Sequence, residues 1–94
     1  MELINDLFRL ENEDKALTFR EIEYLSLIAL GFKNDKIATT LCVTKSTVKK
    51  TLENIFRDLK AKDRANAVAI AFIHKIITPK SLAGIVKRYK LYDI

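Results

Sequence analysis

The sequence has few of the residues that end regular structure or cross-link a chain. Two glycines and one proline among 94 residues disfavour an all-β protein, because such a chain needs a turn signal every eight to twelve residues. A single cysteine excludes an intramolecular disulfide and fits a reducing cytosol. No apolar run approaches the roughly 18 residues of a membrane span, and the N-terminus does not resemble a signal peptide. We therefore expect a helical cytoplasmic protein that does not cross a membrane.

Apolar side chains and positive charge are abundant, and the charge is unevenly distributed. Hydrophobic residues make up 49% of the chain, and the net charge is +5. Residues 1–30 hold three basic and seven acidic side chains, whereas residues 31–94 hold fourteen basic and five acidic ones. This asymmetry suggests a polyanionic partner for the second part. A solvated, soluble surface is the alternative, and charge alone does not separate the two.

The first strong helix signal is a capping box at Thr18-Phe19-Arg20-Glu21, in which Thr18 and Glu21 each bond to the other's backbone amide. It predicts a helix from about 19 to 30, with Gly31 as the C-terminal stop. Apolar residues cover most of this helix's circumference. We expect it to be the buried centre of the domain.

Two helices joined by a tight connection follow. Asn34 is expected to cap a short helix through about Leu41, and Cys42-Val43-Thr44 is the connection. Thr44 is expected to cap a third helix that runs to about Lys60. This third helix carries one clean apolar stripe, formed by Val48, Leu52, Ile55, Phe56 and Leu59.

Further helices are predicted on both sides of this pair. Asp63 caps a fourth helix from about 64 to 77, and Thr78 with Pro79 opens a fifth from about 78 to 91. The spacing of apolar residues at 2–11 predicts a short amphipathic helix at the N-terminus.

The third predicted helix is the main candidate for function. Its polar face carries Ser46, Lys49, Lys50, Glu53 and Arg57. At about 1.5 Å per residue it is roughly 24 Å long, and a helix fits the B-DNA major groove, which is about 12 Å wide. An ordinary solvated lysine face on a helical bundle is the alternative, and charge and periodicity leave the two interpretations about even.

The start of this helix offers a second feature. Thr44, Lys45 and Ser46 can present hydroxyl and backbone N–H groups to a phosphate, and the helix dipole favours that contact.

A longer pattern runs without gaps over residues 17–71. It consists of Leu17 to Leu25, Ile28 to Asn34, Lys36-Ile37-Ala38, Leu41, Val43-Thr44, Ser46 to Lys49, Asn54-Ile55, Leu59, Arg64 and Ala67-Val68. This pattern closely resembles the helix-turn-helix domain of the LuxR/FixJ/NarL family, and in size the chain is similar to a stand-alone, GerE-like regulator.

This resemblance implies an all-α fold with a four-helix LuxR-type domain at 17–77. The helices predicted at the two ends then form a helical extension at 1–16 and a C-terminal extension at 78–94. The third helix would enter the major groove, with Lys49, Lys50 and Glu53 facing bases. A lysine can donate to guanine and a glutamate can accept from cytosine. Alternatively, Glu53 pairs with Lys49 or Arg57 and only orients them. Backbone contacts are expected from Lys36, Thr44, Lys45, Ser46, Thr47, Thr51, Asn54 and Arg57.

The fourth predicted helix has too many apolar residues for one buried stripe. In the family this helix is the dimer contact, so we expect a homodimer on half-sites about 10 bp apart. The rival explanation is internal, because the C-terminal segment or the N-terminal helix could cover the second face. The dimer-interface candidates are Ala67, Ala71, Phe72 and Lys75.

The expected function is sequence-specific binding of double-stranded DNA by a bacterial transcription regulator at the nucleoid. RNA polymerase or another regulator is a further candidate partner. Two alternatives remain: a sigma-factor-like promoter-binding segment, and an interaction module that heterodimerises with a regulator and inhibits it. An enzyme is not expected, because no paired carboxylates, phosphate loop or nucleophile–base set is visible. No cofactor or metal is expected.

Overall fold

The computed structural model describes residues 17–92, which form α-helices and no strand. The predicted helix at 2–11 and the extension 1–16 lie outside the described residues. The expected all-α fold is confirmed, including a helix in the C-terminal segment. The helices are α2 (Phe19–Ala29), α3 (Asn34–Leu41), α4 (Lys45–Leu59), α5 (Arg64–Ile73) and α6 (Pro79–Tyr89).

Most helices begin at a side-chain cap that is local in the sequence. The Thr18 hydroxyl accepts from the Glu21 N–H at 3.1 Å, and the Glu21 carboxylate accepts from the Thr18 N–H at 2.8 Å, so the capping box is confirmed. Thr78 and Ser81 form a second capping box at the start of α6, whereas the Thr44 and Asp63 side chains each accept one backbone N–H at the start of α4 and α5. Each such cap stabilises its helix by about 1 kcal/mol.

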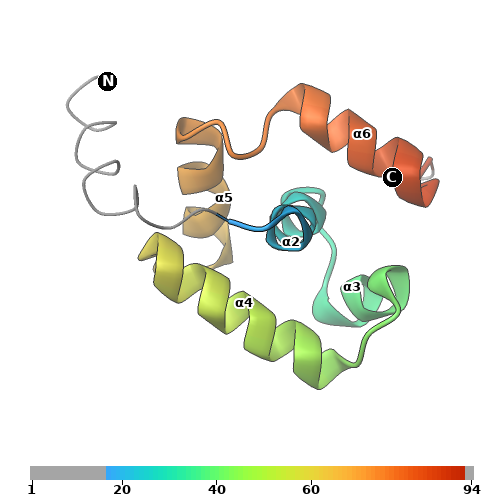
Figure 1. Ribbon diagram of the computed structural model, residues 1–94, viewed down its shortest axis with the longest axis horizontal. Coiled ribbons are helices and arrows are strands. Elements are labelled where there is room, and N and C mark those ends of the chain that lie inside the picture. Colours follow the sequence, from blue (N-terminus) through green and yellow to red (C-terminus); the bar gives the residue numbers. More distant parts are fainter. Residues whose placement is uncertain (1–16, 93–94) are drawn as a thin grey trace.

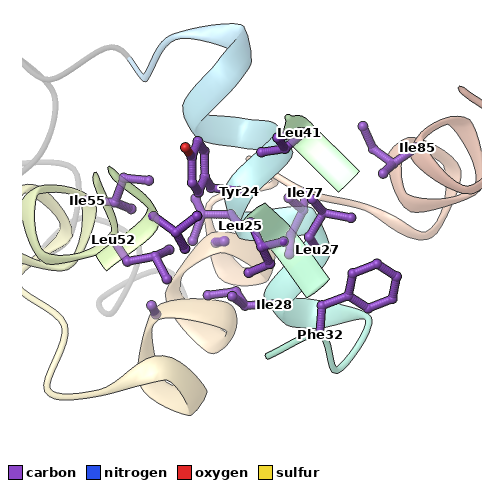
Figure 2. Packing of buried hydrophobic residues seen from close by; sticks show 14 of the residues in the cluster. Tyr24, Leu25, Leu27, Ile28, Phe32, Leu41, Leu52, Ile55, Ile77 and Ile85 are labelled. Atoms are coloured by element: carbon purple, nitrogen blue, oxygen red, sulfur yellow. The ribbon is translucent and has the colours of Figure 1, made fainter. Parts of the chain in front are cut away.

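Helix α2 is the centre of the domain, as its apolar circumference predicts. Figure 1 shows it end-on, with the other helices around it. Its residues from Glu23 to Ile28 are all buried. Figure 2 shows the α2 side chains lying between Leu52 and Ile55 of α4 on one side and Ile77 and Ile85 on the other. Because α2 contacts other helices on several sides, its apolar residues cover most of its circumference and do not form a single stripe.

Helix α5 is shorter than expected and ends at Ile73 instead of about 77. Lys75 adopts a left-handed backbone conformation, with φ of 58°. The N–H of Ile76 then bonds to the Ala71 carbonyl at 2.8 Å, which closes the helix end. The turn carries Ile77 into the core, where it is fully buried. Burial of this side chain therefore outweighs continuation of the helix.

Helix α6 packs mainly against α2, on the side away from α4 (Figure 1). Its apolar anchor is Ile85, which is buried, and Leu91 just beyond the helix is buried as well. The C-terminal segment therefore adds to the core through α2 and does not run along α5. Within residues 17–92 no helix has the length and apolar character that a membrane span requires.

Candidate nucleic-acid interface

The two faces of α4 have opposite chemistry. Four side chains, Val48, Leu52, Ile55 and Leu59, are buried and lock the helix onto the core. Burial of each such side chain contributes roughly 1.5–3 kcal/mol, so the opposite face must point to solvent. That face consists of exposed Lys45, Ser46, Thr47, Lys49, Lys50, Glu53 and Arg57, with partly buried Thr51 and Asn54 at its edges. We call this set the α4 polar face.

The beginning of α4 gathers hydroxyl groups. Thr44 accepts from the Thr47 N–H at 3.1 Å and donates to the Thr47 hydroxyl at 2.9 Å. The Ser46 hydroxyl lies 3.1 Å from that of Thr44. Because Thr44 serves only the Thr47 amide, the N–H groups of Lys45 and Ser46 have no partner inside the helix. This end of α4 can donate to a phosphate oxygen from backbone and side chains together.

Two lysines occupy defined places beside α3. The Lys36 ammonium lies over the ring of Phe32, 4.2 Å from its centroid, a cation–π contact that holds it at the surface. Lys45 forms an ion pair with Asp35 at 3.3 Å, and both side chains are largely exposed. Such a pair is weak in water, so Lys45 can exchange Asp35 for an external anion.

Glu53 forms no ion pair with Lys49 or Arg57 within residues 17–92. Arg57 instead donates to the Asn54 amide oxygen at 2.8 Å. The sequence left two interpretations of Glu53, a contact to a base or an ion pair that orients Lys49 or Arg57. The structure of the described residues does not contain the ion pair. Lys49, Lys50 and Glu53 all reach solvent from one side of the helix.

Helix α3 is held at both ends by arginines that were not among the predicted site residues. Arg64, at the start of α5, donates to the Asn34 side chain at 2.7 Å and to the Phe32 carbonyl at 2.6 Å. Arg20 of α2 donates to the Leu41 carbonyl at 3.1 Å, at the other end. These contacts set where α3, and hence the turn into α4, sits on the domain. Both arginines belong to the sequence pattern, but their targets are distant in the chain.

The expected cap at Asn34 is wrong. Lys33 is the N-cap residue of α3 and makes no side-chain cap bond, while Asn34 is the first helical residue. Its side chain accepts from Arg64 instead. A charged donor from another helix competes better for this amide oxygen than the helix's own N–H groups do.

The four predicted dimer-interface residues fall into two groups. Ala67 and Ala71 are fully buried inside the domain, since α5 turns this side toward α2. They have no surface to offer a partner, which corrects the prediction for these two. Phe72 and Lys75 are exposed. Exposed Ala65 and Ala69 lie with Phe72 on α5, whereas Lys75 follows the end of the helix.

Residues 17–92 contain no group of three or more His, Cys, Asp or Glu side chains that could hold a metal ion. Cys42 is exposed, in the turn between α3 and α4, and adopts a left-handed conformation with φ of 57°.

This arrangement, a short helix, a three-residue turn and a second helix with an exposed cationic face, defines a helix-turn-helix protein. Residues 15–71 match the family described as bacterial regulatory proteins, luxR family (GerE). The chain belongs to this family.

The chain is also similar to curated relatives named response regulator protein VraR. They come from Staphylococcus aureus (strain Mu3 / ATCC 700698), Staphylococcus saprophyticus subsp. saprophyticus and Staphylococcus epidermidis. Each is 46% identical over 63 residues, which cover 67% of this chain. The match spans 30% of the length of each relative.

Proposed function

We propose that this chain is a sequence-specific, double-stranded DNA-binding transcription regulator whose helix α4 enters the major groove. The observation that carries the proposal is the α4 polar face, because its cations are exposed while the apolar stripe behind it is fully engaged. Membership of the luxR family supports it. Such a regulator acts in the bacterial cytoplasm at the nucleoid, where RNA polymerase or another regulator is a candidate partner.

In this proposal, the position of a side chain along α4 decides whether it contacts a base or a phosphate. Lys49, Lys50 and Glu53 lie in the body of the helix and face base edges, where lysine donates to guanine and glutamate accepts from cytosine. The N-terminal hydroxyls and amides, with Lys36 from α3, hold phosphates on either side. Backbone contacts of this kind fix register, whereas base contacts choose the sequence.

We also propose that two copies bind a two-fold site through α5. Phe72 is 39% exposed, and a large apolar side chain in water beside Ala65 and Ala69 favours burial against another surface. Lys75 lies at the rim of this surface. Half-sites would then lie about one helical turn, roughly 10 bp, apart.

The test uses duplexes recovered by selection from a random-sequence pool. Affinity is measured by fluorescence anisotropy for the wild type, Lys49→Ala, Lys50→Ala and Lys45→Ala, on the selected duplex, on a scrambled one and on a duplex with one half-site removed. Lys49→Ala and Lys50→Ala are expected to lose about tenfold on the selected duplex and little on the scrambled one. Removing one half-site is expected to abolish cooperative binding.

Lys45→Ala is the matched control, since it removes the same charge at the end of the helix. It is expected to weaken both full duplexes alike and to reduce the slope of log K against log salt by about 1. Unchanged binding by Lys49→Ala and Lys50→Ala would remove α4 from recognition. Absence of any selected sequence would contradict the proposed function as a whole.

A further inference from the structure

A second group of polar side chains lies between α2 and α6. Glu23 on α2 is only 2% exposed, and a carboxylate in such a place needs compensating donors. Tyr89 of α6 donates to one of its oxygens at 2.6 Å. Arg20 donates to the other at 3.1 Å, and Arg88 lies 3.7 Å from the first. We call these four residues the Glu23 cluster.

One member of this cluster also reaches the helix-turn-helix. The guanidinium of Arg20 donates through one nitrogen to Glu23 and through the other to the Leu41 carbonyl at 3.1 Å. Leu41 ends α3, where carbonyl groups lack a partner inside the helix. The next residues form the turn, closed by a bond from the Val43 N–H to the Ala38 carbonyl at 3.0 Å. A continuous path of hydrogen bonds therefore joins α6 to the turn before α4.

Tyr89 stands at the start of this path. Its hydroxyl lies 3.5 Å from Arg20 as well as 2.6 Å from Glu23. It therefore contacts both Arg20, which donates to the Leu41 carbonyl, and the carboxylate that pairs with Arg20. It belongs to α6, which lies beyond the residues 15–71 that match the family. The contact is therefore an addition to the matched domain.

Burial first, and then the hydrogen bond and charge of Glu23, raise the pKa of Tyr89 above its ordinary value. The phenol thus keeps the proton that it donates. For Arg20, burial alone would lower the pKa, but the hydrogen bond and charge of Glu23 outweigh burial and raise it. Tyr89 therefore stays a neutral phenol and Arg20 stays a cation, so both can donate the hydrogen bonds that join α6 to Leu41.

We propose that Tyr89 is a positioning residue, which holds the end of α3 and the turn into α4 through Glu23 and Arg20. When the hydroxyl is absent, Glu23 loses its shortest partner and Arg20 becomes free to turn toward the carboxylate and away from Leu41. The end of α3 then opens more often, while α5, whose Ala67, Ile70 and Ala71 are buried in the core, does not. The consequence for DNA binding rests on the proposed function, whereas the local opening does not.

The experiment is amide hydrogen exchange followed by NMR on the full chain, comparing the wild type with Tyr89→Phe. This change removes one oxygen and keeps the packed ring. The amides of Cys42 and Val43 are expected to exchange about fivefold faster. The amides of Ala67 and His74, which bond to the carbonyls of the cap residue Asp63 and of Ile70 in α5, are expected to stay unchanged. Tyr92→Phe is the control, because Tyr92 is 71% exposed.

A second variant separates positioning from simple loss of stability. Arg20→Lys keeps the charge but lacks the fork that reaches two acceptors. It is expected to accelerate the same amides, and Tyr89→Phe added to it is expected to have no further effect on them, since both changes cut one path. Additive effects, or equal acceleration in α3 and α5, would overturn the proposal.

The DNA measurement is the last arm. On the selected duplex, Tyr89→Phe is expected to bind about threefold more weakly than the wild type, and Tyr92→Phe is expected to bind equally well. Unchanged affinity together with faster exchange at Cys42 and Val43 would refute the link to DNA binding. If the wild type binds no duplex, the proposed function fails, and the exchange result still decides whether Tyr89 positions α3.

Discussion

The α4 polar face and the contacts behind it use positive charge in opposite ways. On α4, Lys49 and Lys50 are exposed and form no ion pair within residues 17–92. Elsewhere in the domain, Arg20 donates to the Leu41 carbonyl and Arg64 to the Phe32 carbonyl, and Arg88 forms an ion pair with Glu23. Arginine suits the second task, because its planar fork serves two acceptors at once, and lysine suits a hydrated surface that meets phosphates. The difference shows which cations are available to a partner and which belong to the fold.

The largest effect is expected at Arg64. Arg64→Ala removes two short charge-assisted hydrogen bonds, to Asn34 and to the Phe32 carbonyl, and leaves their acceptors partly buried. We expect the free energy of unfolding, measured by urea titration, to fall by about 2–3 kcal/mol. Lys50→Ala, which removes an exposed cation, is the control and should stay within about 0.5 kcal/mol. If the two variants lost equal unfolding free energy, the distinction between cations that stabilise the fold and cations that are available to a partner would be wrong.

A smaller, pH-dependent effect is expected at Tyr89. Because its pKa is raised in the folded protein, its contribution to stability is complete below the ordinary tyrosine pKa of about 10 and is lost as pH rises through the folded value. The groups that face the hydroxyl are Glu23, Arg20 and Arg88. Between pH 8 and pH 11, the wild type should therefore lose more unfolding free energy than Tyr89→Phe. Tyr92→Phe should follow the wild type, and parallel curves for Tyr89→Phe and the wild type would contradict the effect.

The smallest effect on stability and on DNA affinity is expected at the ion pair between Asp35 and Lys45. Here a lysine of the α4 polar face also pairs with a residue of the fold. Both side chains are more than 70% exposed, so Asp35→Asn should change the free energy of unfolding by about 0.5 kcal/mol or less. The same change frees Lys45 and removes a negative charge beside the proposed phosphate site. DNA affinity, measured by anisotropy, should therefore rise about twofold, and Lys45→Ala in the same background should reverse the gain. A loss of affinity in Asp35→Asn would contradict the proposed role of Lys45.

Much of the fold follows from interactions between residues close in the chain. The capping boxes and the caps at Thr44 and Asp63 join groups three residues apart, so their geometry depends only on local backbone conformation. The apolar stripe of α4 likewise determines which of its faces reaches solvent. For that reason the placement of the α4 polar face could be predicted before any tertiary contact was known.

Other features depend on contacts that no local pattern contains. The bonds of Arg64 to Asn34 and of Tyr89 to Glu23 span 30 and 66 residues. The early end of α5 depends on the space that the core offers Ile77, and the burial of Ala67 and Ala71 depends on the side on which α2 meets α5. A periodic apolar pattern shows that a helix has a buried face, but it does not show what covers each residue.

The few glycines, the single proline and the capped apolar stripes thus determined an all-α chain with an exposed basic helix, because caps and amphipathicity act within a few residues. Tertiary structure alone decided which cations remain free and how α6 joins α2. It brought Arg20, Glu23 and Tyr89 together from opposite ends of the described chain, since a buried carboxylate takes its donors from wherever the packed helices place them.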